Sequence, residues 1–348
     1  MKVKIGSHFI GDNQECFVAL EPSATYKNFE EAKKMIKASA DAGAHAVKFQ
    51  TFLPGDADRM MGKKEIKIEF RTMKGLKKES VYEVLKKREL TKEQWIELRN
   101  FAKENNLAFI TSPYFAETVD FLNEIKVDAI KISKGDINNV LLIENSAKTK
   151  LPIILDAREK LDDVNNAVKI CEENNNEHII ILHCPSGYPV ESSGVNLQAI
   201  QFLKNKYNYP IGFADHSEGE IMNFVAIGFG AKMIEKTITL DRSIDEIEHL
   251  MSLEIKELQN FMKNLKVINE AIGNSDVLKV SRVEENVRRS LVSKRDIIKG
   301  EIISKDALDY QRPGAVGISC ADGFKILGFT AKDNIPKGTF IKWDMLDE

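Results

Sequence analysis

Short apolar runs alternate with amphipathic stretches along most of the chain, at intervals of about 25–40 residues. The apolar runs predict eight strands, at 17–20, 45–49, 107–111, 128–132, 152–155, 178–183, 210–214 and 232–236. A helix is expected after each strand, and the clearest are at 29–42, 92–105, 116–125, 161–173, 197–206 and 255–271. Strands that alternate with helices pair in parallel through right-handed crossovers.

Two α/β architectures fit this alternation. An open, doubly wound sheet is the first, but no Gly-rich GxGxxG turn follows the first predicted strand. The second is a closed (β/α)₈ TIM barrel, and eight successive units match it. The pattern therefore predicts a TIM barrel.

Two segments interrupt the alternation. Residues 1–15 are expected to form a hairpin that caps the bottom of the barrel. Residues 54–90 form a long insertion after the second strand, ending in a helical piece at 80–88. Loops of this length are usually functional or disordered. This one leaves the C-terminal face, where the active sites of barrel enzymes lie.

The C-terminal part has a different pattern. A polar stretch at 273–284 reads as a linker that ends the barrel domain, 1–272. Residues 285–348 are rich in short β-like runs, with related units DIIKGEII and NIPKGTFI that predict a small pseudo-symmetric β-module. A module of this size is marginally stable alone, so we expect it to dock on another surface.

Composition narrows the class of protein. Hydrophobic residues make up 43% and charged residues 30% of 348 residues, and the net charge is -3, with no dense basic block. A nucleic-acid partner is therefore not expected. The four cysteines have no CxxC spacing, which fits a reducing compartment. No signal pattern or bilayer-length apolar run occurs, so we expect a cytoplasmic protein without a membrane partner.

Lys48 and Lys131 each lie inside an apolar predicted strand. An unpaired buried ammonium is costly, so an anion is expected beside each one. One interpretation is a pair of lysines that bind a phosphate or carboxylate substrate, with Lys134 and Lys236 adding positive charge. The other is an ion pair of each lysine with a glutamate or aspartate of the barrel interior.

His216 follows Asp215 at the end of a predicted strand. This arrangement is typical of a metal ligand or a general acid/base, although a hydrogen-bonded structural histidine has the same pattern. His183 is interpreted as structural. No HxH, HExxH or CxxC motif occurs, so a metal site would have few ligands.

The whole chain resembles the sialic acid synthases, a family that includes synthases of N-acetylneuraminic, legionaminic and pseudaminic acids. The resemblance in the barrel rests on KIGSHFIGD (4–12), AVKFQTF (46–52), ESVYEVLKKREL (79–90), TSPY (111–114), HCPSGYP (183–189), GFADHSEGE (212–220) and SLE (252–254). ENVRRSLV (285–292) and QRPGAVGI (311–318) resemble the family's antifreeze-like (SAF) domain.

The resemblance implies a reaction. The family condenses phosphoenolpyruvate with an N-acetylated aminosugar aldehyde, which gives a nonulosonic acid and phosphate, and a divalent metal (Mn²⁺ or Mg²⁺) polarises the aldehyde. It also implies that the SAF domain of one subunit inserts an arginine, here Arg312, into the site of the other subunit of a domain-swapped homodimer.

Site residues carried over from the family fall into three groups. Those assigned to catalysis are Glu21, Lys48, Lys131, His216 and Glu235. Those assigned to substrate binding are Gln50, Thr111, Lys134, Ser186, Tyr188 and Arg312, with Lys48, Thr111 and Lys131 as phosphoenolpyruvate ligands and Gln50 as a sugar contact. His216 is the expected metal ligand, with Glu248 as a possible neighbour.

Several positions depart from the family pattern. Thr237 replaces the second metal histidine, Glu248 an aspartate, and Lys134, Asp156 and Ala214 replace serines. Asp156 is expected to repel a phosphate unless Lys134 and Arg158 neutralise it.

These departures leave three functional interpretations open. The first is a divergent synthase of a nonulosonic acid. The second is a barrel enzyme with another small anionic substrate and a weak metal or none. The third is a non-catalytic paralogue.

Overall fold

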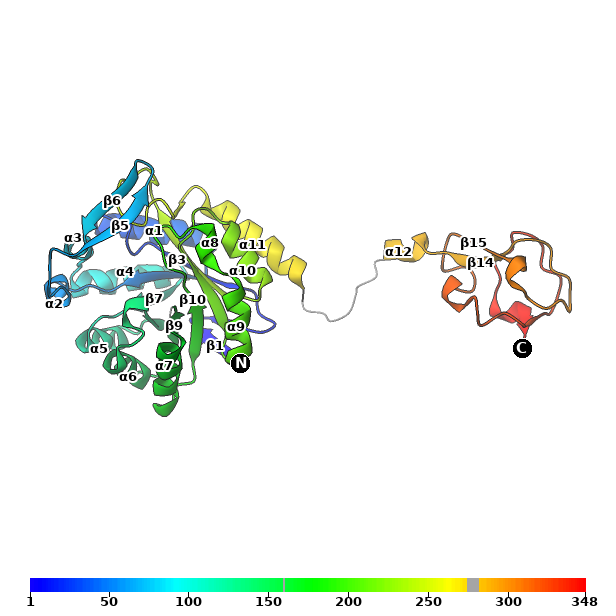
Figure 1. The fold of residues 1–348 in the computed structure, drawn as a ribbon, viewed down its shortest axis with the longest axis horizontal. Coiled ribbons are helices and arrows are strands. Elements are labelled where there is room, and N and C mark those ends of the chain that lie inside the picture. The colour runs from blue at the N-terminus through cyan, green and yellow to red at the C-terminus, as the bar shows by residue number, and fades with distance from the viewer. Residues whose placement is uncertain (159, 274–281) are drawn as a thin grey trace. The chain divides into compact units, whose positions relative to one another are not determined.

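A computed structural model describes residues 1–158, 160–273 and 282–348 (Figure 1). Contacts divide the chain into two compact units, Met1–Gly273 and Asn274–Glu348. Most of the predicted linker, 273–284, lies outside the described residues.

The first unit is the predicted barrel. Its strands within the described residues are β3 (Phe17–Glu21), β4 (Ala46–Gln50), β7 (Ala108–Ser112), β8 (Ala129–Ile132), β9 (Ile153–Ala157), β10 (Ile179–His183), β11 (Ile211–Asp215) and β12 (Met233–Thr239). All pair in parallel with their neighbours, and β12 pairs with both β11 and β3, so the sheet closes. The prediction of a TIM barrel is confirmed.

Helices cover the outside of this sheet (Figure 1). They are α1 (Phe29–Asp41), α4 (Lys92–Glu104), α5 (Ala116–Glu124), α6 (Val140–Lys148), α7 (Leu161–Glu173), α8 (Ser192–Val195), α9 (Gln198–Lys206), α10 (Ile221–Gly228) and α11 (Leu258–Ile272). Helix α4 begins at a capping box, in which Thr91 and Gln94 satisfy each other's backbone N–H groups. The apolar face of each helix packs on the outer face of the barrel sheet. The residues between the helices and the sheet form the larger core.

The inner face of the sheet forms a second, smaller core. Alternate strand residues such as Phe17, Ala46 and Ile154 fill the lower lumen. The hairpin β1 (Lys2–Ile5) and β2 (His8–Gly11) adds Val3 and Ile10 to the same cluster. The hairpin therefore closes the bottom of the barrel, as the sequence predicted, and leaves the C-terminal end of the lumen for polar side chains.

The insertion after β4 contains an element that the sequence analysis missed. It holds α2 (Asp56–Met60), the antiparallel pair β5 (Lys67–Thr72) and β6 (Gly75–Ser80), and α3 (Val81–Lys86), with the predicted helical piece at 80–88. Phe70 packs with Val84 and Ile247, and the Arg71 N–H donates to the Tyr188 carbonyl. These contacts hold the hairpin beside the loop that follows β10.

The second unit has its own core of ten buried hydrophobic residues among those described. Its described elements are α12 (Arg282–Val287), β14 (Ser290–Ser293), β15 (Leu308–Gln311), β16 (Thr330–Ala331), β17 (Leu346–Asp347) and short 3-10 turns. Ile297 and Ile335, from the two related sequence units, exchange both backbone hydrogen bonds at 2.9 and 2.8 Å. Gly300 and Gly338 follow them with φ of 83° and 82°, a conformation that favours glycine. The predicted pseudo-symmetry is present.

Candidate active site

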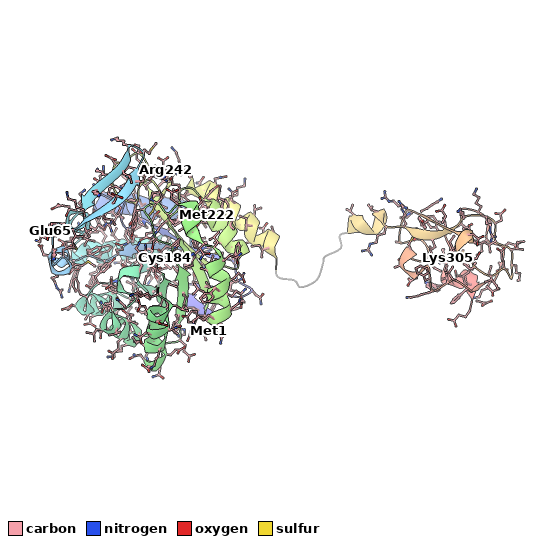
Figure 2. The ribbon with its side chains drawn as sticks, in the orientation of Figure 1. Met1, Glu65, Cys184, Met222, Arg242 and Lys305 are labelled. Atoms are coloured by element: carbon pink, nitrogen blue, oxygen red, sulfur yellow. The ribbon has the colours of Figure 1, made fainter. Side chains whose placement is uncertain are left out.

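Strand alternation builds a polar ring at the C-terminal end of the lumen. Side chains two residues beyond the inward apolar ones must also face inward. On this basis the polar residues and the cysteine that face the lumen are Glu21, Lys48, Gln50, Ser112, Lys131, Ser133, Asp156, Cys184, His216, Glu235 and Thr237. Figure 2 labels Cys184 within the barrel unit. Every barrel strand contributes to this ring, directly or through the residue that follows it.

Lys48 is one of two charged centres in the ring. Its Nζ lies 2.5 Å from Glu21 Oε1, and both side chains are almost fully buried. Burial alone would raise the pKa of Glu21, but the charges of Lys48 and Lys131 outweigh burial and lower this pKa. Glu21 is therefore ionised, and it lies close to both lysines.

Lys131 is the second centre. Its Nζ lies 3.1 Å from Asp156 Oδ1 and also forms an ion pair with Glu235. The anion expected beside each lysine is present, and it is an interior carboxylate in both cases. The alternative of interior ion pairs holds. Lysine burial alone therefore does not indicate a substrate.

A stronger indication of a ligand comes from polar atoms that lack partners. Among the described residues, several buried side-chain atoms accept or donate no hydrogen bond. Four of them belong to the ring and its rim and have no ion-pair partner either: Lys134 Nζ, His216 Nδ1, Glu235 Oε2 and Thr237 Oγ1. Buried polar groups are normally satisfied, so a cluster of exceptions needs an explanation. A polar ligand at this end of the lumen supplies one.

His216 lies next to a buried lysine. The Tyr188 ring stacks on the His216 ring with centroids 5.5 Å apart, and Lys134 Nζ lies 4.1 Å from the centre of the Tyr188 ring. Burial, and then the charge of Lys134, lowers the pKa of His216 well below its usual value. His216 is thus a neutral imidazole at physiological pH.

The predicted contact of Thr111 with the substrate is not supported. Thr111 is in register with Phe49 and Ile130, which belong to the outer core, and its hydroxyl lies 2.7 Å from that of Thr51. Ser112 occupies the inward position instead, and Ser133 Oγ donates to its hydroxyl at 3.0 Å. The inward position of β7 thus belongs to Ser112 and not to Thr111.

Lys236 does not add charge to the lumen. Its fully buried Nζ lies 2.7 Å from Asp215 Oδ2, outside the barrel, where Asp215 also accepts from Ser217 and Asn223. His183 also faces outward, with Nε2 2.6 Å from the Val195 carbonyl. Its interpretation as structural agrees with this contact.

Arg88, at the end of the insertion, is a site residue that the sequence analysis missed. It is buried, and its Nη1 donates to Gln50 Oε1 at 2.9 Å. Burial raises the pKa of Glu248, and the charge of Arg88 lowers it in part. Glu248 has a left-handed φ of 71°, which is uncommon for a residue other than glycine, asparagine or aspartate. These two residues extend the polar ring toward the rim.

The remaining predicted residues lie further out. Ser186 is exposed, and its hydroxyl accepts a hydrogen bond from Arg158 Nε. The Lys134 backbone N–H donates to Asp156 Oδ2 at 3.2 Å, while its ammonium points elsewhere. Asp156 is thus ion-paired with Lys131 rather than with the side chain of Lys134. Arg312 is exposed in the second unit.

The donor set does not fit a protein-bound divalent metal well. Among the described residues, no three His, Cys, Asp or Glu side chains come together as metal ligands. His216 Nδ1 has no hydrogen-bond partner, but Thr237 supplies only a neutral hydroxyl. We therefore assign no chemical step to a metal in this chain.

Glu235 gives a testable pH dependence. Burial, partly offset by Lys131, raises the pKa of Glu235 to about 7. Below pH 7 this carboxyl is neutral, and above pH 7 its negative charge opposes an anion in the ring. We expect the affinity for phosphoenolpyruvate to fall about tenfold between pH 6 and 8, measured by calorimetry. Glu235→Gln should remove this part of the pH dependence, and an unchanged profile in that variant would contradict the assignment.

Residues 35–277 match the NeuB family, and residues 288–347 match the SAF domain. An N,N'-diacetyllegionaminic acid synthase of Campylobacter jejuni is 35% identical, over 89% of this chain and 94% of that protein. The N,N'-diacetyllegionaminic acid synthase of Legionella pneumophila is 30% identical, over 97% of this chain and 96% of that protein.

A solved structure is similar as well. The N-acetylneuraminic acid synthetase of Leptospira borgpetersenii, in complex with citrate, is 30% identical, with a TM-score of 0.72, over 82% of this chain and 94% of that chain. None of the described helices is long and apolar enough to cross a membrane. With a family match over most of its length, a closed barrel and a SAF domain, the chain belongs to the NeuB family.

Proposed function

We propose that this chain condenses phosphoenolpyruvate with an N-acetylated aminosugar aldehyde, which gives a nonulosonic acid and phosphate. The observation that carries the proposal is the polar ring, in which two lysines, three carboxylates and an imidazole converge at the end of the lumen. Four buried polar atoms of the ring and its rim have no hydrogen-bond partner among the described residues. Relatives at about 30% identity are synthases of such acids.

The reaction needs a site that binds the anionic groups of phosphoenolpyruvate and a group that gives a proton to the aldehyde oxygen. C3 of phosphoenolpyruvate forms a bond to the aldehyde carbon, the aldehyde oxygen takes a proton, water adds its hydroxyl at C2, and phosphate leaves. Lys48 and Lys131 hold the carboxylate and phosphate groups by charge-assisted hydrogen bonds. Glu235, with a pKa of about 7, can keep its proton when the anion binds. A neutral Glu235 attracts Lys131 less strongly, so Lys131 can bind the anion instead.

Arg312 has a role in this proposal that concerns a second subunit. In the family resemblance, the arginine of QRPG completes the site of the partner in a domain-swapped homodimer. Arg312 is exposed and follows β15, so its guanidinium is available to another surface. We propose that this contact is to the acceptor sugar of the partner's site.

A direct assay tests the function. Purified full-length chain is mixed with phosphoenolpyruvate and, in turn, N-acetylated hexosamines and 2,4-diacetamido sugars, and phosphate release is measured. The proposal predicts release that depends on one acceptor, with an equimolar nonulosonic acid product. Release without an acceptor, or none with any acceptor, would contradict it.

One observation favours a different small anionic substrate. Asp156 lies 3.1 Å from Lys131, where the family has a neutral serine, and its charge opposes a phosphate. If phosphoenolpyruvate is the substrate, Asp156→Ser should lower its KM by about tenfold, because one repulsive charge is removed. Saturation kinetics would measure this. A higher KM for phosphoenolpyruvate would mean that Asp156 takes part in binding. That result would favour a different small anionic substrate.

A further inference from the structure

Thr237 and His216 mark the place where the family resemblance puts a metal. They lie at the ends of the adjacent strands β12 and β11. Thr237 Oγ1 and His216 Nδ1 are both buried without a hydrogen-bond partner. Something polar must satisfy them when the site is in use. The chain nevertheless lacks the second imidazole that would hold a metal there.

Lys134 brings a positive charge to the same place, and burial lowers the pKa of this lysine. Its buried Nζ has no hydrogen-bond partner and lies over the Tyr188 ring, which stacks on His216. Burial lowers the pKa of His216, and the charge of Lys134 lowers it further. This lysine is itself a departure from the family, which has a serine at this position.

The two departures have one physical consequence. An ammonium repels a divalent cation from the neighbouring imidazole, and the loss of a ligand weakens metal binding further. An ammonium also offers three N–H donors that can stabilise negative charge on an oxygen, as a Lewis acid does. Among the described residues, no protein atom accepts a hydrogen bond from Lys134 Nζ, so a substrate oxygen can accept one without breaking a protein hydrogen bond.

We propose that Lys134 replaces the divalent metal in this chain, by donating a hydrogen bond to the acceptor's aldehyde oxygen. The inference rests on the proposed function. As the C2=C3 electrons of phosphoenolpyruvate form the new bond to the aldehyde carbon, the aldehyde oxygen takes the Lys134 proton. The water that adds at C2 returns a proton to the amine, and phosphate leaves with the hydroxyl proton. No metal is consumed or required.

The first test is metal binding, which does not depend on turnover. Full-length wild type and a Lys134→Ser/Thr237→His double variant are titrated with Mn²⁺ by electron paramagnetic resonance. Wild type is expected to leave Mn²⁺ free, and the double variant is expected to bind it at the rebuilt site. Binding of Mn²⁺ by wild type at the His216 site, lost in His216→Ala, would overturn the proposal even if no acceptor is ever found.

The second test uses turnover. Wild-type activity should change less than about twofold after EDTA treatment, and Lys134→Met should lower kcat by about 10²–10³-fold with little change in the KM for phosphoenolpyruvate. Lys134→Arg, which keeps a cationic donor, should recover part of kcat. Lys206→Met, at an exposed position on α9, is the matched control. A rise in KM alone would assign Lys134 to phosphate binding instead and would overturn the proposal.

Discussion

Lys131→Met is expected to lower phosphate release by at least about 10³-fold and to destabilise the barrel by about 3–5 kcal/mol. Lys131 compensates Asp156 and Glu235, so its loss leaves two buried carboxylates side by side. Because Glu235 can be protonated near pH 7, the loss of stability should be smaller at pH 6 than at pH 8. Phosphate release and urea unfolding at both pH values measure the two effects.

Lys236→Met is the matched control for this experiment. Lys236 also forms a fully buried ion pair, with Asp215, but outside the lumen. Its loss should destabilise the barrel by a similar amount while the folded protein keeps its turnover within a few-fold. Equal losses of turnover in the two variants would show that Lys131 matters only for folding.

Arg312→Ala is expected to lower kcat/KM by about 10²-fold without changing the melting temperature, because an exposed arginine that contacts a substrate contributes to binding and not to the core. The proposed domain swap allows a sharper experiment. When Arg312→Ala and Lys131→Met chains are unfolded and refolded together, half of the dimers are mixed and each has one complete site. Activity should then return to about a quarter of wild type.

Two outcomes would contradict the exchange of arginines between subunits. The first is no recovery in the mixture, although each variant refolds alone and forms dimers by sedimentation. The second is a monomeric wild type with full activity. Either result would place Arg312 outside the partner's site.

The sequence was sufficient for the architecture because barrel strands leave a strong pattern. All eight predicted runs begin within one residue of the observed strands, and seven end within two residues, whereas β12 continues for three residues beyond its predicted end. The alternation of inward and outward side chains along each strand also defines the polar ring. Applied strictly to the sequence, it would have placed Ser112, and not Thr111, in the lumen, and Lys236 on the outer face of the sheet. The hairpin β5–β6 had a similar signal in Ile68 and Phe70, but its apolar side chains are few.

The pairing of charges could not be predicted in the same way. Glu21 and Lys48 come from neighbouring strands, but Lys131 meets Glu235 from across the lumen, 104 positions later. Which carboxylate reaches which lysine depends on side-chain direction at one level of the barrel, and no sequence period encodes it. Arg88 likewise joins the site only through the fold of the insertion.

The departures from the family pattern form a set in space. Asp156 faces Lys131, whereas Lys134 lies by Tyr188 and His216, near Thr237 at the end of the adjacent strand. Random loss of a site would scatter substitutions over the barrel. Here the added carboxylate, Asp156, has a cationic partner in Lys131. The added cation, Lys134, lies near His216, where Thr237 replaces the second metal histidine of the family.

A crystal structure of the full chain with phosphoenolpyruvate tests the central claim most directly. We expect the ligand's anionic groups to contact Lys48 and Lys131 Nζ at about 2.7–2.9 Å, with the contact between Lys131 and Glu235 lengthened. Saturating phosphoenolpyruvate that leaves both lysines in their present ion pairs, with no ligand between them, would contradict the account.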